Sequence, residues 1–400
     1  MTDTNISAER QPDRQLTEFE AALVATDPQF AAAQPDPAVA AAVAQHMGRP
    51  GIRLPQIVRT VLDGYADRPA LGQRAVEYVT DPATGRTHAA LLAHYETVSY
   101  REVAERVQAL GNSLSAAAVR PGDRVAVLGF TSVDYTVIDV TLGQIGAVAV
   151  PLQTAAAVGS LVPVVAETEP RVIAVSVDSL PGAVELALSG PAPTRVVVFD
   201  YHDRVDDHRD ALADARARLS GAEVVVEPLE DLLTRGQVIS APPELDAGGD
   251  SDPLALLVYT SGSTGAPKGA MYPQSKVAGM WVRTTKNWFG PTAASITLNF
   301  MPMSHIMGRS ILYGTLGNGG TAYFGARSDL STLLDDLALV RPTELNCVPR
   351  VWEMLHQHFQ SEVTALTGID RSSAEAAVLT RMRQDLLGGR CIFAMTGRCR

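Results

Sequence analysis

The sequence has very little lysine. Only three of its 33 basic residues are lysines, at Lys268, Lys276 and Lys286, and none follows Lys286 in a chain of 400 residues. The formal net charge is −11 at pH 7. Proteins whose main partner is nucleic acid or an anionic membrane depend on an excess of positive charge. The composition therefore argues against both kinds of partner.

Cysteine is equally scarce. Cys347, Cys391 and Cys399 share no spacing typical of a metal site, and an odd count does not suit a disulfide framework. The first residues, Met1 to Asn5, contain neither a basic region nor an apolar segment of the kind found in targeting peptides. Together these absences predict a protein of the reducing cytoplasm.

A single long stretch lacks charge. Residues Val140 to Ala166 contain no Asp, Glu, Lys or Arg, and the stretch is long enough to cross a bilayer. However, several Gly and Pro residues interrupt it, among them Gly143, Gly146 and Pro151. This favours a helix end, a buried strand, a loop and a helix start over a membrane span.

Strand and helix patterns alternate from Gly122 onward. Expected strands include Arg124 to Leu128, Ala147 to Leu152, Val172 to Val175 and Arg195 to Phe199, with helices such as Ser132 to Leu142 between them. This alternation predicts an α/β fold with mainly parallel sheets and helices on both faces. Ligands of such sheets bind beyond the carboxyl ends of the strands.

Two parts of the chain differ in composition. Residues 1–50 are rich in Ala, Pro and Asp and are expected to form a loosely attached leader, with a helical piece around Glu18 to Ala25. Residues 51–400 are expected to form one large domain that contains more than one core, because 400 residues exceed an ordinary single core. A helix is expected to begin after Ser99, with Glu102 completing a capping box.

The most informative stretch runs from Leu254 to Ala270. An apolar strand, Leu254 to Tyr259, leads into six small residues, of which two are glycines that permit a tight turn and four carry hydroxyls. Lys268 then supplies a mobile positive charge. The residues expected to bind phosphate are Thr260, Ser261, Gly262, Ser263, Thr264, Gly265 and Lys268.

This stretch predicts a concave anion site suited to a polyphosphate. It is not a Walker A loop, because Pro267 stands where that motif requires glycine before lysine. The alternative interpretation is a flexible Ser/Gly connector, which the order strand, small-residue loop, Pro-Lys-Gly and strand makes the less favoured one.

A histidine follows the next strand. The strand Ser295 to Met301 ends in Pro302-Met-Ser-His-Ile-Met-Gly-Arg309, which places His305 on a strand-to-helix turn. An imidazole titrates near about 6.5, so it can act there as a hydrogen-bond donor or as a cation toward a ligand. The alternative is a histidine that only bonds backbone at a helix start. The residues alone leave both possibilities open.

No metal site is expected. His356 and His358 lie two residues apart on a predicted helix, so they do not share a face, and they are interpreted as surface residues. The segment Tyr201 to Ser220 is dense in Asp, Arg and His. A solvated helix of mixed charge explains it better than a metal or docking patch.

Several segments together resemble one family. Gly122 to Val127, Leu152 to Thr154, Ala266 to Pro273 and Pro302 to Arg309 are similar to the adenylation domain of bacterial carboxylic acid reductases. This family belongs to the adenylate-forming superfamily and is also known under the name long-chain fatty-acid–CoA ligase. The resemblance extends from about Arg53 to Gly397. It implies the large N-terminal domain of an acyl-CoA synthetase-like α/β fold.

The resemblance implies a reaction in stages. A carboxylate attacks the α-phosphorus of ATP with Mg²⁺, which releases pyrophosphate and leaves an acyl-adenylate. The acyl group then passes to phosphopantetheine on a carrier domain, and a reductase domain uses NADPH to release an aldehyde. The loop from Thr260 to Gly265 and the catalytic Lys268 would hold the β- and γ-phosphates. His305, also catalytic, would lie against AMP and the carboxylate.

The last residues depart from the family pattern. The family has Gly-Ser-Ala-Pro where this chain has Gly397-Arg-Cys-Arg400, so Arg398 occupies the position of the small Ser that backs the adenine. The Tyr-Gly-x-Thr-Glu segment, the ribose-binding Asp, and the small C-terminal subdomain with its catalytic lysine are absent, as are the carrier and reductase domains. We therefore expect a C-terminally truncated fragment with little or no activity. Its last strand, Cys391 to Met395, should leave apolar surface uncovered and make the chain marginally stable.

Three hypotheses follow. The chain is the adenylating part of a carboxylic acid reductase or of a fatty-acid–CoA ligase; or it is a non-catalytic fragment that binds nucleotide weakly; or it is a stand-alone phosphate-loop NTPase. The third predicts ADP rather than AMP as product, and it lacks the loop spacing of that class.

Overall fold

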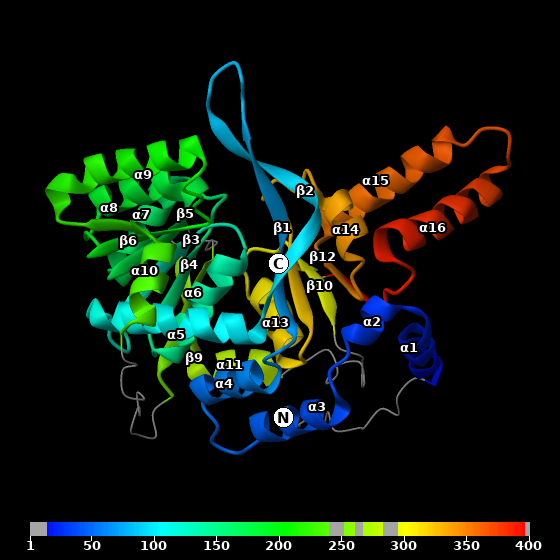
Figure 1. Cartoon of the computed structure of the whole chain (residues 1–400), viewed down its shortest axis with the longest axis horizontal. Helices are drawn as coiled ribbons and strands as arrows, with labels where there is room; N and C mark the ends of the chain where they lie inside the picture. Colours follow the sequence, from blue (N-terminus) through cyan, green and yellow to red (C-terminus); the bar gives the residue numbers. More distant parts are fainter. Residues whose placement is uncertain (1–13, 240–251, 261–266, 283–294, 397–400) are drawn as a thin grey trace.

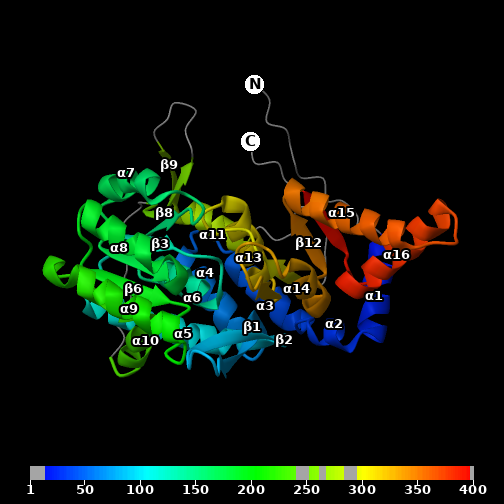
Figure 2. The ribbon, with the colours of Figure 1, turned by 90° about the horizontal axis from the view of Figure 1, so that it is seen from above.

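The computed structural model describes residues 14–239, 252–260, 267–282 and 295–396. Within them the strands form a seven-stranded and a six-stranded sheet, each with helices packed against it (Figure 1). Seen from above, the two sheets and their helices lie side by side (Figure 2). The fold is the α/β arrangement that the strand and helix patterns predict.

The seven-stranded sheet is parallel except at one edge, where β8 and β9 pair antiparallel. Its central strands are buried along their whole length, which explains their continuous apolar sequences. In spatial order the strands are β7 (Val225–Pro228), β6 (Arg195–Phe199), β5 (Val172–Ser176), β3 (Arg124–Leu128), β4 (Val148–Leu152), β8 (Leu254–Thr260) and β9 (Lys268–Pro273).

Alternate residues of these strands enter two different cores. Val125 and Val127 of β3 pack with α5 (Tyr100–Ala116), α6 (Val133–Gln144) and α10 (Leu229–Gln237). Ala126 and Leu128 pack on the opposite face. The helices there are α7 (Val158–Thr168), α8 (Leu180–Ser189) and α9 (Asp206–Leu219), which is followed by a 3-10 turn, Ser220–Ala222. The side-chain period of two in a strand produces this division.

The six-stranded sheet contains the longest strands among the described residues, and the sequence patterns did not predict them. They are β1 (Pro69–Thr80) and β2 (Thr87–Ser99), an antiparallel hairpin that rises above the rest of the molecule in Figure 1. The other strands run parallel to one another and to β1. In spatial order the sheet is β13 (Phe393–Thr396), β12 (Glu344–Cys347), β10 (Ile296–Asn299), β11 (Thr321–Phe324), β1 and β2.

The tip of this hairpin is tied to the other sheet. Arg86 forms ion pairs with Asp207 and Asp210 of α9, at 2.5 and 2.6 Å, and the backbone N–H of Thr87 donates to Asp206 at 2.6 Å. At the base of the hairpin, the capping box between Ser99 and Glu102 starts α5 as predicted. The hairpin, which belongs to the six-stranded sheet, therefore also contacts a helix that covers the seven-stranded sheet.

Helices α13 (Ile306–Gly317), α14 (Leu333–Val340) and α15 (Pro349–Ala365) contact strands of the six-stranded sheet, whereas α11 (Gln274–Val282) contacts β8 and β9 of the seven-stranded sheet. The indole of Trp281 in α11 stacks on the ring of Tyr313 in α13, with 4.7 Å between centroids. Two long helices, α15 and α16, form a hairpin that extends from the sheet in Figure 1. The second helix of this hairpin, α16, spans Arg371–Leu387. Another helix, α4 (Leu54–Gly64), packs against α3 (Pro37–Met47), α5 and α11.

The described part of residues 1–50 is more closely attached than a loose leader. It forms α1 (Arg14–Thr26), α2 (Pro28–Ala32) and α3 (Pro37–Met47). Phe30 is completely buried, Asp27 pairs with the buried Arg390 at 3.1 Å, and Arg68 donates to the carbonyl of Gln34 at 2.9 Å. For residues 14–50 the expectation of a loosely attached leader is therefore wrong. Packing against the second sheet overrides the low-complexity composition.

The charge-free stretch from Val140 to Ala166 divides as expected. It contains the end of α6, the whole of β4 and most of α7. Across the described residues, none of the helices combines the length and the apolar character that crossing a membrane requires.

Candidate functional site

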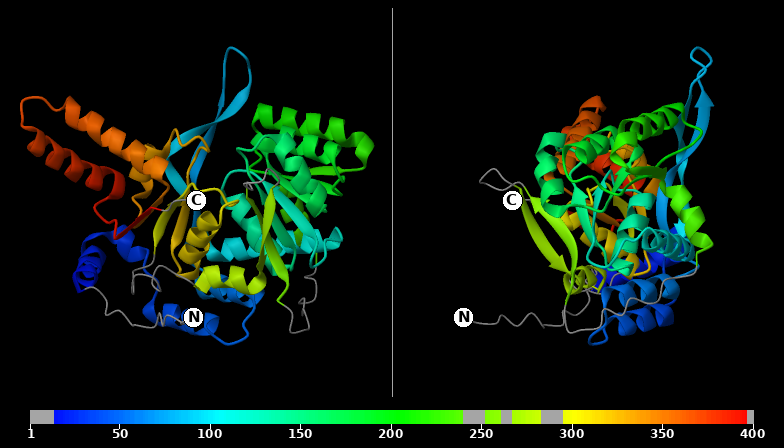
Figure 3. Two further views of the ribbon diagram at one scale, coloured as in Figure 1. Left: turned by 180° about the vertical axis from the view of Figure 1, so that it is seen from behind. Right: turned by 90° about the vertical axis from the view of Figure 1, so that its left-hand side faces the viewer.

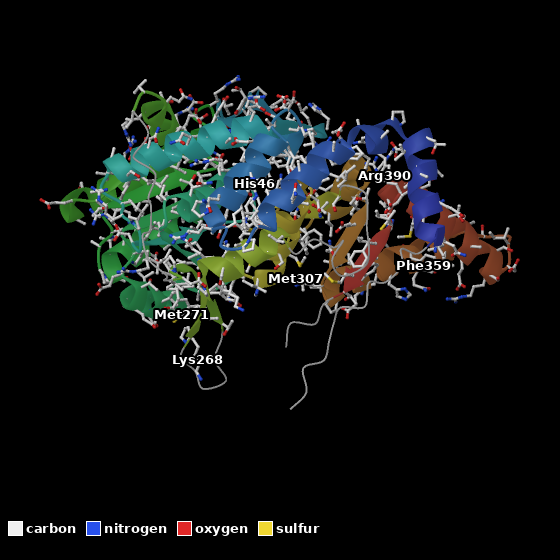
Figure 4. The ribbon with its side chains drawn as sticks, turned by 90° about the horizontal axis from the view of Figure 1, so that it is seen from below. His46, Lys268, Met271, Met307, Phe359 and Arg390 are labelled. Carbon is white, nitrogen blue, oxygen red and sulfur yellow. The ribbon has the colours of Figure 1, made fainter. Side chains whose placement is uncertain are left out.

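The predicted phosphate loop begins at the end of β8 and leads into β9. Thr260 and Lys268 face each other as the last paired residues of the two strands. Ser261, Gly262, Ser263, Thr264 and Gly265, which were predicted to bind phosphate, lie outside the described residues, as does Arg398. Lys268 is exposed at the loop end of this hairpin (Figure 4). Figure 3 shows the two strands of the hairpin extending from the rest of the molecule.

Two contacts fix the strands that position this loop. The side-chain amide of Gln153, which follows β4, donates to the carbonyl of Tyr259 at 3.4 Å. A Cβ on Gly269 would lie only 3.1 Å from the ring of Tyr259. Because that ring lies against the β9 backbone, glycine is favoured after Lys268. In the Lys268-Gly269 sequence, the glycine is thus explained by packing, whereas the lysine is explained by its predicted binding of phosphate.

His305 is the N-cap residue of α13, in an extended conformation with φ −108° and ψ 137°. Its side chain is exposed and makes no capping hydrogen bond to the helix. The purely structural interpretation, a histidine that bonds backbone at a helix start, therefore has no support in this geometry. The imidazole is free to face a ligand.

Arg309 stabilises the turn that contains His305 by a hydrogen bond to its backbone. The guanidinium Nε–H donates to the carbonyl of Met303 at 2.7 Å, and the backbone N–H of His305 donates to Pro302 at 3.0 Å. A Cβ at Gly308 would lie 2.7 Å from the carbonyl oxygen of Pro302, so the turn needs glycine there. The backbone before His305 is therefore specified by the residues that follow it.

Arg309 is itself buried, with 1% of its side chain exposed, and it pairs with the equally buried Asp139 of α6. The hydroxyl of Tyr313 also donates to Asp139. Burial works to lower the pKa of Arg309, but Asp139, Tyr313 and Tyr135 together outweigh it and raise the pKa above its usual value. The arginine thus stays charged and links the His305 turn to the first half of the molecule.

The carboxyl ends of the two sheets meet next to this turn. Thr131, which follows β3, donates its hydroxyl to the carbonyl of Met301, which follows β10, at 3.0 Å. The predicted phosphate loop follows β8 in the same sheet as β3. Both predicted site segments therefore lie at carboxyl ends of parallel strands, where α/β folds bind ligands. Among the described residues, no hydrogen bond or ion pair joins His305 to Thr260 or Lys268.

A cavity of 590 Å³ lies beside His305, and the sequence patterns did not predict it. It lies between α11, α13 and the strands β12 and β13. Met307 lies on its wall in the centre of Figure 4. Its main lining residues are Tyr272, Ser275, Lys276, Met280, Ser295, Ile306, Met307, Ser310, Ile311, Thr315, Glu344, Asn346, Phe393 and Met395.

The volume of this cavity is in the range of small-molecule sites. Its wall is largely apolar, with a few polar side chains set among methionine, isoleucine and phenylalanine. The sequence contained one indication of which strand residues line this cavity. Side chains two apart on a strand share a face, and Glu344/Asn346 and Phe393/Met395 have that spacing.

A model of the family described as AMP-binding enzyme matches residues 79–393. The chain belongs to the AMP-binding enzyme family. The carboxylic acid reductase of Mycobacterium tuberculosis is 56% identical over 389 residues, which cover 96% of this chain and 32% of that protein. The carboxylic acid reductase of Mycobacterium marinum is 57% identical, with 98% and 33% covered. The chain therefore spans about a third of the length of these relatives.

Solved structures give the same assignment for the fold. The adenylation domain of the carboxylate reductase from Mycobacterium chelonae matches with a TM-score of 0.93 and 43% identity, covering 100% of this chain and 62% of that one. The adenylation domain of carboxylic acid reductase from Segniliparus rugosus, in complex with AMP and a co-purified carboxylic acid, matches with a TM-score of 0.89 and 44% identity, with 96% and 62% covered. The predicted resemblance to these AMP-binding adenylation domains is confirmed.

Proposed function

We propose that this chain activates a carboxylic acid by forming an acyl-adenylate from ATP, with release of pyrophosphate, at the low rate expected of a truncated fragment. The observation that carries the proposal is the 590 Å³ cavity whose wall begins at Ile306, the residue after the exposed His305. Family membership and the relative that was crystallised with AMP and a carboxylic acid support it. The acyl part of the acid would occupy the cavity, and its carboxylate would lie at the His305 end.

The chemistry asked of the protein is positioning and charge stabilisation. A carboxylate oxygen attacks the α-phosphorus, and the bond to the bridging oxygen of pyrophosphate breaks, so negative charge moves onto the leaving group. Lys268 and the backbone of the Thr260–Gly265 loop would stabilise that charge, and preorganised donors of this kind are an effective source of catalysis. His305 would donate to the attacking carboxylate or to the α-phosphate.

Magnesium would be held chiefly by the nucleotide in this proposal. Among the described residues, no three His, Cys, Asp or Glu side chains are grouped so that they could hold a metal ion. Mg²⁺ commonly binds through one or two carboxylates together with substrate phosphates and water, so this arrangement does not oppose its use. When bound, it would neutralise phosphate charge.

The later stages belong to the whole protein. They would be transfer to phosphopantetheine on a carrier domain and reduction by NADPH. The name carboxylic acid reductase supports a reduction step, and the structure of an adenylation and carrier didomain from Segniliparus rugosus supports a carrier domain. The alternative end chemistry is ligation to coenzyme A. A long-chain-fatty-acid–CoA ligase of Mycobacterium bovis supports it at 27% identity over 332 residues.

The test is product analysis. The chain is incubated with ATP, Mg²⁺, a panel of carboxylic acids and hydroxylamine, which traps acyl-adenylates as hydroxamates. We expect AMP, pyrophosphate and a hydroxamate in equal amounts, and only when acid is present. ADP and phosphate as products would instead identify an NTPase. The absence of any nucleotide turnover would support a non-catalytic fragment.

A further inference from the structure

One wall of the cavity beside His305 is formed by successive turns of α13. Ile306 and Met307 lie at one end, next to His305, and Thr315 lies at the other. Because an α-helix rises about 1.5 Å per residue, the wall from Ile306 to Thr315 is roughly 13 Å long. A ligand with its carboxylate at His305 would thus extend along this wall, away from the phosphates.

The opposite wall consists of two layers of strand residues. Asn346 of β12 pairs with Met395 of β13, and Glu344 pairs with Phe393. Both strands run parallel to β10, whose end leads to His305. The Asn346 layer therefore lies nearer His305, and the Glu344 layer lies about 7 Å deeper, since a strand rises about 3.3 Å per residue.

The first layer contains a polar group without a partner. Asn346 is 6% exposed, and its side-chain Oδ1 has no hydrogen-bond partner within the described residues. A buried carboxamide oxygen without a partner destabilises a protein, so this position is retained at a cost. A half-turn of the carboxamide exchanges its acceptor and its donor, and so either can be offered to the cavity.

The deeper layer also contains polar groups, but these groups have hydrogen-bond partners within the protein. The buried carboxylate of Glu344 accepts a hydrogen bond from the hydroxyl of Ser295. The hydroxyls of Thr297 and Thr315 are 3.1 Å apart. The cavity thus has an apolar wall and a polar far end. A pocket for purely aliphatic or unsubstituted aromatic acids needs no such groups.

We propose that the acid bound here carries a hydroxyl group some distance from its carboxyl group, and that Asn346 determines this specificity. This inference rests on the proposed function. The carbon atoms between the two groups would lie against Met307, Ile311 and Met395. The hydroxyl would donate to the carboxamide of Asn346 or accept from it. A site built around such a bond rejects the analogue that lacks the hydroxyl, because its own buried polar group then stays unpaired.

The test compares matched acids on wild type and on Asn346→Leu. Acid-dependent ATP–pyrophosphate exchange is measured with ω-hydroxy acids of increasing chain length, hydroxyaryl acids, and the same acids without the hydroxyl. For wild type we expect kcat/KM to be about tenfold or more higher for the best hydroxy acid than for its analogue, as one buried hydrogen bond implies. Asn346→Leu should bring this ratio close to one.

Two further variants serve as a control and as a replacement for Asn346→Leu. Met395→Leu alters the neighbouring residue of the same layer without removing a polar group, and it should leave the ratio unchanged. Asn346→Ala cannot overpack the cavity and replaces Asn346→Leu if that variant does not fold. Thermal unfolding of each variant separates a loss of fold from a loss of selectivity.

The outcomes separate this inference from the proposed function. Equal rates for hydroxy acids and their analogues in wild type would refute the role of Asn346 but leave acid activation standing. Preference for dicarboxylates would also refute it, and would assign recognition to Lys276 on the α11 wall. If no acid supports exchange, both the proposed function and this inference fail.

Discussion

Replacing Arg309 by methionine should destabilise the protein by about 3–5 kcal/mol, the usual result of breaking a buried ion pair by removing one partner. Asp139 would remain as a buried charge with 2% of its side chain exposed, and within the described part of the chain only the hydroxyl of Tyr313 would still donate to it. A domain of ordinary stability has about 5–15 kcal/mol in total, so Arg309→Met would lose a large fraction of it.

The same substitution should disturb the candidate site. It removes the hydrogen bond from Nε of Arg309 to the carbonyl of Met303, two residues before His305. At temperatures where the variant is still folded, we expect acid-dependent exchange to fall by about tenfold, as expected for the loss of one well-placed bond.

Urea unfolding followed by circular dichroism measures the stability loss. The matched control is the double variant Asp139→Leu with Arg309→Met, in which no charge is left unpaired. Apolar replacement of a buried pair is often neutral, so the double variant should recover most of the loss. A cost below about 1 kcal/mol for Arg309→Met, within the range of exposed ion pairs, would refute the reasoning.

Two further predictions concern stability. Burial lowers the pKa of both His202 and His208, so the folded state binds fewer protons than the unfolded one between the folded pKa and the ordinary value near 6.5. Stability should therefore fall as the pH drops below about 6.5 in urea titrations, and a variant with His202→Phe and His208→Gln should show a flatter pH profile; an unchanged profile would contradict this. Gly236→Ala should cost more than the usual 1–3 kcal/mol of overpacking, because its Cβ would lie 1.8 Å from the carbonyl oxygen of Ala109. Gly221→Ala, with open space around it, is the control, and equal melting temperatures for the two variants would overturn this assignment.

The parts of the fold that sequence patterns predicted are those with strong local signals. The strand at Arg195–Phe199 is buried on both faces, which leaves a continuous apolar run with no competing interpretation. The β1–β2 hairpin was missed because large parts of it are only partly covered, so β2 shows no regular alternation. The contacts that tie its tip to α9, at Arg86 and Thr87, join residues that lie far apart in the sequence.

Of the N-terminal helices, α1 was predicted as a helical piece around Glu18 to Ala25, whereas α2 and α3 were missed although a signal existed. Asp27 and Asp36 are N-caps, each followed by proline at the first helical position, and this is a recognised start signal. The Ala- and Pro-rich composition of residues 1–50 is typical of loosely ordered segments and outweighs this signal in the sequence.

For the candidate site, the sequence identified residues but not their surroundings. His305 was placed correctly on a strand-to-helix turn, whereas the role of Arg309 in holding that turn depends on Asp139, distant in sequence. The cavity could not be predicted, because it requires the register of β12 against β13 and the packing of α13 over both.

The most direct test of the central claim is ATP–pyrophosphate exchange by wild type, His305→Ala and Lys268→Met, with His356→Ala as a control on the exposed surface of α15. If this chain activates acids at the carboxyl ends of its two sheets, exchange requires a carboxylic acid. It is then strongly reduced in the first two variants and unchanged in the control. Exchange that is independent of acid, or that survives both substitutions at the wild-type rate, would contradict the account.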